Sequence, residues 1–309
     1  MTDTARAVRF DHYGGREVLY VADIPMPVPS TGQVVVAVKA AAINPGETTI
    51  RSGRFHDQAP STFPSGQGSD LAGVVTEVGD GVQQWVPGDE VLGYSWERSS
   101  QASHVAVPAD QLIRKPPELN WETAGSLYVV GCTAYAAVRA VAAGPGDTVA
   151  VSAAAGGVGT IVVQLLGVRG AQALGIASST NAEWLTAHGA IPVAYGDGLA
   201  ERLREAAPEG IDAFIDLFGP EYVQLAADLG IDHDRIETII SFEKAAQIGA
   251  RAEGSGTAST PEVLTEMAGL VASGAIEVPI AATFPLEQVA EAFALLEQRH
   301  TRGKIVLIP

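Results

Sequence analysis

The sequence predicts an α/β chain with two domains, an all-β, barrel-like region and a region with a parallel sheet. The chain has 309 residues, which is about the length of two typical domains. Short apolar runs broken by glycine and proline fill its first third, and strand-like and helical segments alternate after about Trp121. Because such alternation is typical of βαβ units, it favours a parallel sheet covered by helices.

In the first third, short apolar or alternating segments are bounded by turn residues, a pattern that favours strands. We expect these strands at residues 33–44, 71–79, 88–94 and 102–116. Turns are expected at the sequences PSTG, VGDG and VPGD, where glycine and proline favour chain reversal.

The later region begins with a helical stretch at 122–138. Strands are then expected at 148–153, 173–178, 192–196, 212–217 and 235–241, with helices from Val158, around 181–189 and around 199–207. This order is typical of a Rossmann-type, doubly wound sheet. Two helices with one apolar face each follow Pro261, and a strand at 302–309 ends the chain.

The amino-acid composition limits which kinds of binding partner and which compartment we expect. A net charge of −17 would repel nucleic acid and anionic membrane surfaces, so we expect neither as a partner. No long uninterrupted apolar run and no secretory signal are evident, and we therefore expect a cytoplasmic protein. Cys132 is the only cysteine and can form no disulfide within the chain.

The segment VSAAAGGVGT, residues 151–160, gathers three glycines between a predicted strand and a predicted helix. A glycine inside such an element costs about 1 kcal/mol relative to alanine, so the cluster points to a ligand that approaches the backbone. Ala154, Gly156 and Gly159 match the dinucleotide pattern G-x-G-x-x-G, with alanine replacing the first glycine. We expect Gly156 to admit a pyrophosphate and Gly159 to let the helix pack on the sheet. The alternative is a tightly packed helix start without a ligand.

The end of the second predicted strand indicates which dinucleotide binds. NAD-binding sites usually place a carboxylate there, whereas this chain has Ala177, Ser178, Ser179 and Thr180. Hydroxyl groups can donate to a 2′-phosphate, and no carboxylate repels it, so we predict NADPH. The alternative is that the hydroxyl groups only form a turn or cap the next helix, since no lysine or arginine accompanies them.

Seven blocks of sequence carry a family resemblance: residues 40–55, 68–93, 129–138, 153–165, 188–198, 211–219 and 302–307. In this order and spacing they resemble the medium-chain dehydrogenase/reductase superfamily, and within it the zinc-independent quinone oxidoreductases similar to zeta-crystallin. The resemblance implies a GroES-like β-barrel catalytic domain at 1–125 and 260–309 and a Rossmann NADP(H)-binding domain at 126–259. It also implies a homodimer, although 219–260, where the family forms its dimer strand, looks short.

The resemblance implies that no metal takes part. Zinc-dependent relatives carry a cysteine where this chain has Asn44 and a His-Glu pair where it has Ser69 and Asp70. The resemblance further implies Asn44 as a catalytic residue whose amide donates to the substrate carbonyl or contacts the cofactor. The alternative is that Asn44 only caps a turn before Pro45. Thr49 stands where relatives often have a proton-donating tyrosine, and it is the other catalytic candidate.

The same resemblance implies the cofactor-binding residues. Besides Gly156, Gly159, Ser178 and Ser179, they are Thr133, Ala155, Gly157, Val158, Tyr195 and Lys304. Gly196 replaces the basic residue that usually follows the tyrosine, and Thr133 could equally serve only in packing.

The implied activity is hydride transfer from NADPH to a quinone or another activated carbonyl, with small molecules as partners. There are two alternatives. One is an NADPH-dependent double-bond reductase that acts on enones or enals, and the other is a protein that binds NADPH as a sensor without turnover.

Overall fold

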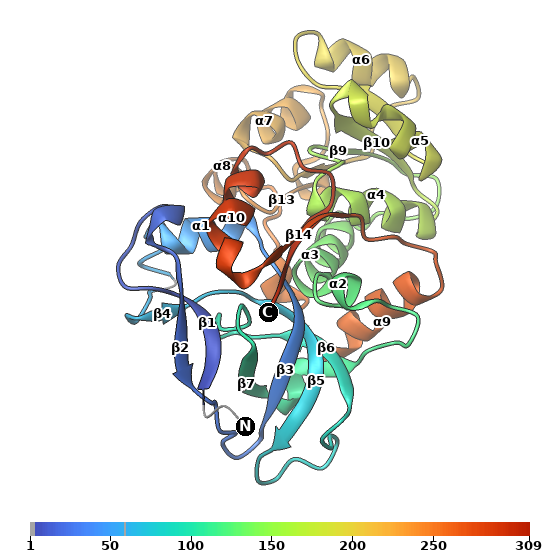
Figure 1. Cartoon of the computed structure of the whole chain (residues 1–309). Coiled ribbons are helices and arrows are strands. Elements are labelled where there is room, and N and C mark those ends of the chain that lie inside the picture. The colour runs from blue at the N-terminus through green and yellow to red at the C-terminus, as the bar shows by residue number, and fades with distance from the viewer. Residues whose placement is uncertain (1–3, 59) are drawn as a thin grey trace. The chain divides into compact units, whose positions relative to one another are not determined.

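The computed structural model describes residues 4–58 and 60–309, which divide into two compact units (Figure 1). Within the described residues, unit 1 contains the chain up to Val129 together with 260–272 and 279–309. Unit 2 contains 130–259 and 273–278. The C-terminal segments therefore return to the unit that the N-terminal segment begins.

Unit 1 is built mainly from antiparallel strands. Its larger sheet has seven strands, in the order β14-β15-β3-β5-β6-β8 with β7 paired to β3, and a three-stranded sheet has the order β2-β1-β4. The strands are β1 (Thr4–Phe10), β2 (Tyr20–Pro25), β3 (Gln33–Ala42), β4 (Ser65–Gly66), β5 (Asp70–Val78), β6 (Glu90–Tyr94), β7 (His104–Pro108), β8 (Leu112–Arg114), β14 (Ile280–Pro285) and β15 (Lys304–Ile308).

The β-branched residues of β3 explain its central place in this sheet, because Val34, Val36 and Val38 pack with Leu71 and Val91 in one buried cluster. The helices of unit 1 are α1 (Pro45–Arg51), α2 (Trp121–Ala124), the start of α3 (Leu127–Ala140), α9 (Pro261–Ala272) and α10 (Val289–Glu297).

Unit 2 contains a parallel sheet of five strands in the order β11-β10-β9-β12-β13. Numbered along the chain this is 3-2-1-4-5, the order of a doubly wound sheet, and Figure 1 shows helices gathered around it. Its strands are β9 (Thr148–Val151), β10 (Gln172–Ala177), β11 (Ile191–Ala194), β12 (Ala213–Asp216) and β13 (Ile236–Thr238). Its helices are α4 (Gly157–Val168), α5 (Ala182–Ala187), α6 (Leu199–Ala206), α7 (Pro220–Asp228) and α8 (Phe242–Ile248), with most of α3.

Six short 3₁₀ helices connect these elements within the described residues. They are η1 (Arg16–Val18), η2 (Ala109–Gln111), η3 (Ser179–Asn181), η4 (His233–Arg235), η5 (Ser255–Thr257) and η6 (Leu286–Gln288).

The predicted α/β fold class is confirmed, and two predicted elements need correction. The stretch 102–116 is two strands separated by η2, and 122–138 is two helices separated at Gly125. A Cβ at Gly125 would lie 2.4 Å from the Ala40 carbonyl oxygen, so this break is where the chain closely approaches β3.

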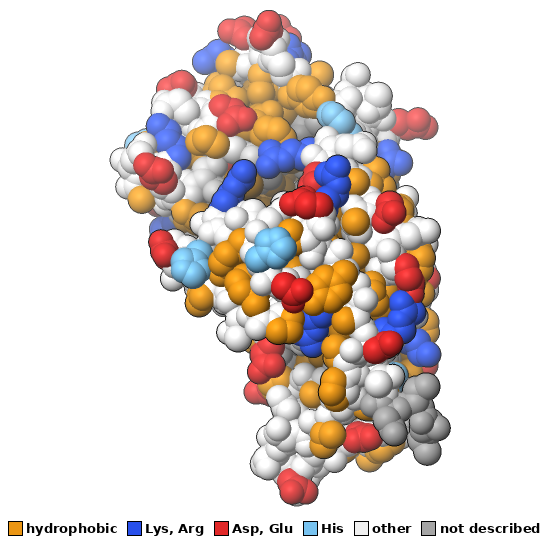
Figure 2. Space-filling view, turned by 60° about the vertical axis from the view of Figure 1, so that its left-hand side comes forward, with side chains coloured by type: hydrophobic (Ala, Val, Ile, Leu, Met, Phe, Trp, Pro, Cys, Tyr) orange, Lys and Arg blue, Asp and Glu red, His pale blue; other side chains and the backbone are white. Residues whose placement is uncertain are grey.

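On the face drawn in Figure 2, acidic, basic and apolar side chains are interspersed. Among the described residues, no helix is long and apolar enough to cross a membrane.

Candidate functional site

The glycine cluster lies between β9 and α4, as predicted, and Gly156 is the N-cap of α4. No side chain caps this helix end. Since the first N–H groups of a helix have no partner inside it, an uncapped glycine N-terminus presents donors to an anion. A Cβ on Gly156 would meet only the Ala153 carbonyl oxygen, at 3.2 Å, leaving aside its chain neighbours and its own helix. Apart from this one contact, the Cβ direction of Gly156 is open.

Gly159 has a different environment. A Cβ there would lie 2.2 Å from the Ala153 carbonyl oxygen and 2.7 Å from the Ala154 Cα, a separation that atoms do not tolerate. The turn after β9 and the first turn of α4 thus pack backbone against backbone, the close packing that the glycine pattern predicts. Ala155 is buried at this turn, while Gly157 and Val158 are half-buried.

The predicted adenosine-side residues meet at the carboxyl ends of β10 and β11. The Tyr195 N–H donates to the Ala177 carbonyl at 3.3 Å, and the Tyr195 side chain is exposed. The Ser178 hydroxyl lies 3.0 Å from that of Thr180 and accepts from its N–H, so it caps η3, the alternative role considered for it. Ser179 is exposed beside it. Thr133 is buried on α3.

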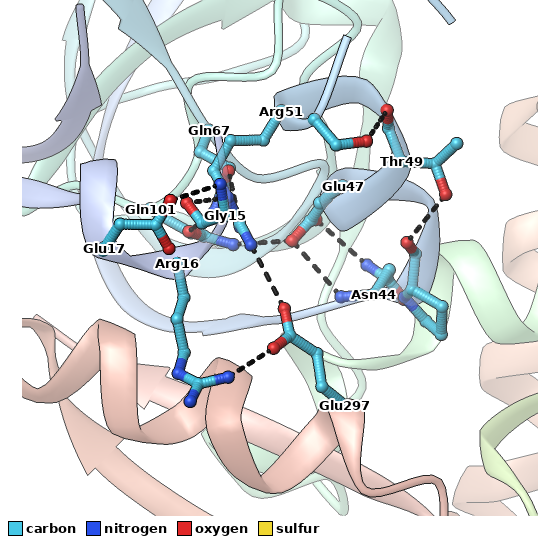
Figure 3. Close-up of polar contacts among 12 residues, drawn as sticks. Gly15, Arg16, Glu17, Asn44, Glu47, Thr49, Arg51, Gln67, Gln101 and Glu297 are labelled. Carbon is cyan, nitrogen blue, oxygen red and sulfur yellow. Dashed lines mark hydrogen bonds and ion pairs between the residues drawn. The ribbon is translucent and has the colours of Figure 1, made fainter. Parts of the chain in front are cut away.

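Asn44 lies buried at the N-terminus of α1, in a group of polar side chains shown in Figure 3. Its Nδ2 donates to Asp70 Oδ2 at 2.7 Å and to Glu47 Oε1 at 3.2 Å. Its Oδ1 accepts from Lys304 Nζ at 2.5 Å. Because lysine can only donate, this contact fixes the orientation of the Asn44 amide.

Lys304 is 3% exposed, and its other contacts are with Ile43 and Asp70. Nζ donates to the Ile43 carbonyl at 3.2 Å and lies 3.7 Å from Asp70 Oδ2. Burial lowers the pKa of Lys304, and the charges of Asp70 and Glu47 oppose this effect. The structure therefore places Asn44 and Lys304 in direct contact. From the sequence, Asn44 was expected to be catalytic and Lys304 to bind the cofactor.

Glu47 is the second buried carboxylate of this group. Its Oε2 accepts from the Asn44 N–H at 3.2 Å and from Gln101 Nε2 at 2.9 Å. Burial raises the pKa of Glu47 to about 7, despite the donors that stabilise its charged form. We call Asn44, Glu47, Asp70, Gln101 and Lys304 the Asn44 cluster.

Sequence reasoning missed the roles of Glu47 and Gln101. Asn44 and Glu47 are spaced as a capping box, and this signal was present in the sequence. No comparable signal marks Gln101, which comes from a distant loop before β7.

Further polar contacts extend from the Asn44 cluster, as Figure 3 shows. Gln67 donates to Gln101 at 3.3 Å and accepts from the buried Arg51, whose Nη2 lies 3.3 Å from Glu297 Oε1. The Arg51 guanidinium also lies over the Phe293 ring, 4.6 Å from its centroid. These contacts hold α1 against α10 and the loops beside them.

Thr49 lies on α1 but outside the Asn44 cluster. Its hydroxyl donates to the Pro45 carbonyl at 3.5 Å, and its own carbonyl accepts from the Ser52 hydroxyl at 2.9 Å. Both contacts stay within the helix and its C-terminus, so the structure does not bring Thr49 to Asn44.

Two family models match parts of the chain. A model described as "Alcohol dehydrogenase GroES-like domain" matches residues 30–117, and one described as "Zinc-binding dehydrogenase" matches residues 185–307. The human quinone oxidoreductase is 30% identical over 328 residues, which cover 98% of this chain and 97% of that protein. The chain belongs to the quinone oxidoreductase family. It is accordingly an oxidoreductase of the medium-chain dehydrogenase/reductase superfamily.

Other members of the quinone oxidoreductase family agree in sequence and fold. Quinone oxidoreductase 1 of Escherichia coli is 29% identical and covers 99% of this chain and 100% of its own. The quinone oxidoreductase structure from Coxiella burnetii superposes with a TM-score of 0.88 at 30% identity, covering 99% of both chains. The Escherichia coli quinone oxidoreductase solved with NADPH has a TM-score of 0.86 at 27% identity and covers 98% of this chain and 100% of its own.

One of the matching models is named for zinc, and the donors of a zinc site are nitrogen, sulfur and carboxylate oxygen atoms. Within the described ranges, no group of three or more His, Cys, Asp or Glu residues could hold a metal ion. At Asn44 and Asp70 the cationic partner is the Lys304 ammonium. An amide oxygen bonded to an ammonium does not fit the nitrogen and sulfur donors that zinc prefers.

Proposed function

We propose that this member of the quinone oxidoreductase family uses NADPH to reduce a quinone or another activated carbonyl, without zinc. The Escherichia coli relative solved with NADPH supports this choice of cofactor. The uncapped N-terminus of α4 supports it too, because the first N–H groups of a helix can donate to a pyrophosphate. NADPH, when bound, supplies the hydride.

In this proposal unit 2 holds the cofactor. The N–H groups of Gly157 and Val158 bind the pyrophosphate, with Gly156, Gly159 and Ala155 shaping the turn. Ser178, Ser179 and Tyr195 hold the adenosine end, and Thr133 is assigned to the nicotinamide end on the family resemblance alone.

The contacts among Lys304, Asn44 and Asp70 are the observation that supports a zinc-independent mechanism. A buried ammonium, held by an amide oxygen and a carboxylate, supplies fixed positive charge in unit 1 where a second cation would be repelled. Both Asn44 Nδ2 hydrogens are used within the Asn44 cluster. We therefore assign Asn44 to positioning Lys304 and Asp70. Thr49 stays a catalytic candidate, but its hydroxyl is a poor acid, so water or solvation of the product supplies any proton that is needed. A cytoplasmic homodimer completes the proposal.

Loss of NADPH absorbance with phenanthrenequinone tests this function, with NADH and a short aliphatic enone run in parallel. We expect rapid, NADPH-selective oxidation that a zinc chelator does not change. Gly156→Val should abolish NADPH binding, because a branched side chain would occupy the space of the pyrophosphate. Gly167→Val is the control, since a Cβ at this exposed position of the same helix meets no atom within 4 Å.

The outcomes separate the two alternatives. Faster oxidation with the enone than with the quinone would identify a double-bond reductase. Tight NADPH binding without oxidation by any acceptor would identify a sensor. Unchanged NADPH affinity in Gly156→Val would contradict the assigned pyrophosphate site.

A further inference from the structure

Three aromatic side chains of unit 1 form a contact group, which we call the aromatic triad. The Tyr94 and Tyr128 rings stack with centroids 4.1 Å apart and an interplanar angle of 13°. The Trp96 ring meets both at a steep angle, with centroids 5.7 Å from Tyr94 and 6.5 Å from Tyr128. Both tyrosines are buried, whereas Trp96 is 53% exposed.

The aromatic triad borders the Asn44 cluster through Asp70. Tyr94 is the partner of Asp70 in the β5–β6 ladder. The N–H of Val129, the residue after Tyr128, donates to Asp70 Oδ1 at 2.8 Å. Asp70 Oδ2 accepts from Asn44. Asp70 thus connects both tyrosines to the Asn44 cluster, Tyr94 through the strand pairing and Tyr128 through the N–H of its neighbour Val129.

The position of Trp96 suggests a ligand rather than a packing role. A packing tryptophan buries most of its ring, whereas here two buried, stacked tyrosines hold an indole that stays half in solvent. The tyrosines contact Trp96 at a steep angle rather than stacking on it, and more than half of its surface stays exposed. An electron-rich indole stacks best on a planar, electron-poor ring system.

We propose that Trp96 is a substrate-binding residue that stacks on planar, fused-ring quinones beside the Asn44 cluster. This inference rests on the proposed function and names the acceptor class for it. A fused-ring quinone is planar and electron-poor, so it matches the indole face in shape and charge distribution. A short aliphatic enone has no extended π face and gains nothing from Trp96.

Steady-state kinetics of Trp96→Ala test the proposal, using the full chain with NADPH. For phenanthrenequinone we expect KM to rise about tenfold while kcat changes less than about twofold, the size of one lost aromatic stacking contact. The KM for a short aliphatic enone should not change. Trp96→Phe should restore most of the affinity, because an aromatic face is kept. An unchanged KM for phenanthrenequinone in Trp96→Ala, or an equal rise for the enone, overturns the proposal.

Fluorescence quenching by phenanthrenequinone without NADPH measures the contact independently of turnover. Trp184→Phe is the matched control, because Trp184 belongs to unit 2 and stacks on His188 instead. We expect saturable quenching in the unmodified protein and in Trp184→Phe, and its loss in Trp96→Phe. Equal quenching in Trp96→Phe overturns the proposal. If no acceptor oxidises NADPH, the proposed function fails, and the quenching result still decides the role of Trp96.

Discussion

Ala153 has a φ of +46°, in the left-handed region that glycine adopts readily and other residues avoid. Its carbonyl oxygen accepts from the Gly156 N–H at 2.9 Å, so this strained residue closes the turn before α4. A left-handed alanine costs about 1 to 2 kcal/mol. Relief of that strain exceeds the entropy that glycine loses on folding. We expect Ala153→Gly to raise the free energy of unfolding by up to about 1 kcal/mol.

Urea denaturation of the unliganded protein measures this effect. Ala155→Gly is the control, because Ala155 lies in the same turn and is not among the residues with positive φ. It should lose at least about 1 kcal/mol, since glycine there adds flexibility to the unfolded chain and removes a buried methyl group. Equal losses in the two variants would show that Ala153 is not strained.

Single residues of the candidate site differ in how far the sequence predicts them. The glycines at 156 and 159 are predictable because the constraint is local. A Cβ at Gly159 would lie 2.2 Å from the Ala153 carbonyl oxygen, and this close approach follows from a short turn. The contact of Asn44 with Lys304 is not predictable from the sequence, because 260 positions separate the two residues. Periodicity and motif spacing cannot measure such a distance. Only the pairing of β15 with β3 brings Lys304 to its partner.

At the scale of elements, the first turn of α6, which follows β11, carries a cation that is not among the residues predicted for a 2′-phosphate site. The Arg202 guanidinium donates to the carbonyls of Ala194, Asp197 and Gly196, at 3.0, 2.7 and 3.1 Å. Among the residues that the structure describes, it forms no ion pair with a carboxylate. Arg202 therefore supplies unneutralised positive charge to the turn after Tyr195, next to the end of β10.

Because this charge favours a 2′-phosphate, Arg202→Ala should lower NADPH affinity while NADH affinity changes little. We expect the ratio of the two affinities to fall about tenfold, the size of one charge-assisted contact. Arg204→Ala, on the exposed side of the same helix, removes an equal charge and should leave the ratio unchanged. A purely structural role of Arg202 would weaken both cofactors equally. The affinities of 2′-phospho-AMP and AMP, each measured by competition with the cofactor, provide a second measure of the preference for a 2′-phosphate.

Whole elements were predictable where an apolar pattern matches burial, as in β9, α4 and α10. The helix α1 has the opposite pattern, since its buried residues are Glu47 and Arg51. A short helix that buries charges gives no hydrophobic periodicity, which explains why the sequence did not predict it. The edge strand β14 has no fully buried residue, and it was missed for the same reason.

At the scale of the whole molecule, carboxylates set the response of stability to pH. Burial raises the pKa of Glu47 to about 7 in unit 1 and that of Glu237 to about 8 in unit 2. Hydrogen bonds from Val86 and Arg114 lower the pKa of Asp89. The contribution of Asp89 to stability is present above its unfolded pKa and is lost as pH falls through its folded pKa. The two buried glutamates act in the opposite direction.

Of the two buried glutamates, Glu237 allows the clearer test of how a buried carboxyl group makes stability depend on pH. Its Oε1 accepts from the Glu253 N–H at 2.6 Å, and its Oε2 is buried with no partner among the described residues. Because the folded pKa of Glu237 lies above its ordinary value of 4.5, its contribution to stability is full below about pH 4.5 and is lost as pH rises through about 8. The unmodified protein should therefore become less stable between about pH 5 and about pH 9.

Glu237→Gln should reduce this loss, because glutamine keeps the acceptor for Glu253 and never has to bury a charge. Glu47 still titrates in the variant, so part of the loss should remain. Glu209→Gln removes one negative charge from an exposed loop, and it shows how far net charge alone changes the result. Denaturant unfolding at the two pH values measures all three proteins. If Glu237→Gln loses as much stability as the unmodified protein, Glu237 is ionised throughout this range, and the buried carboxylate has a partner that its described contacts do not include.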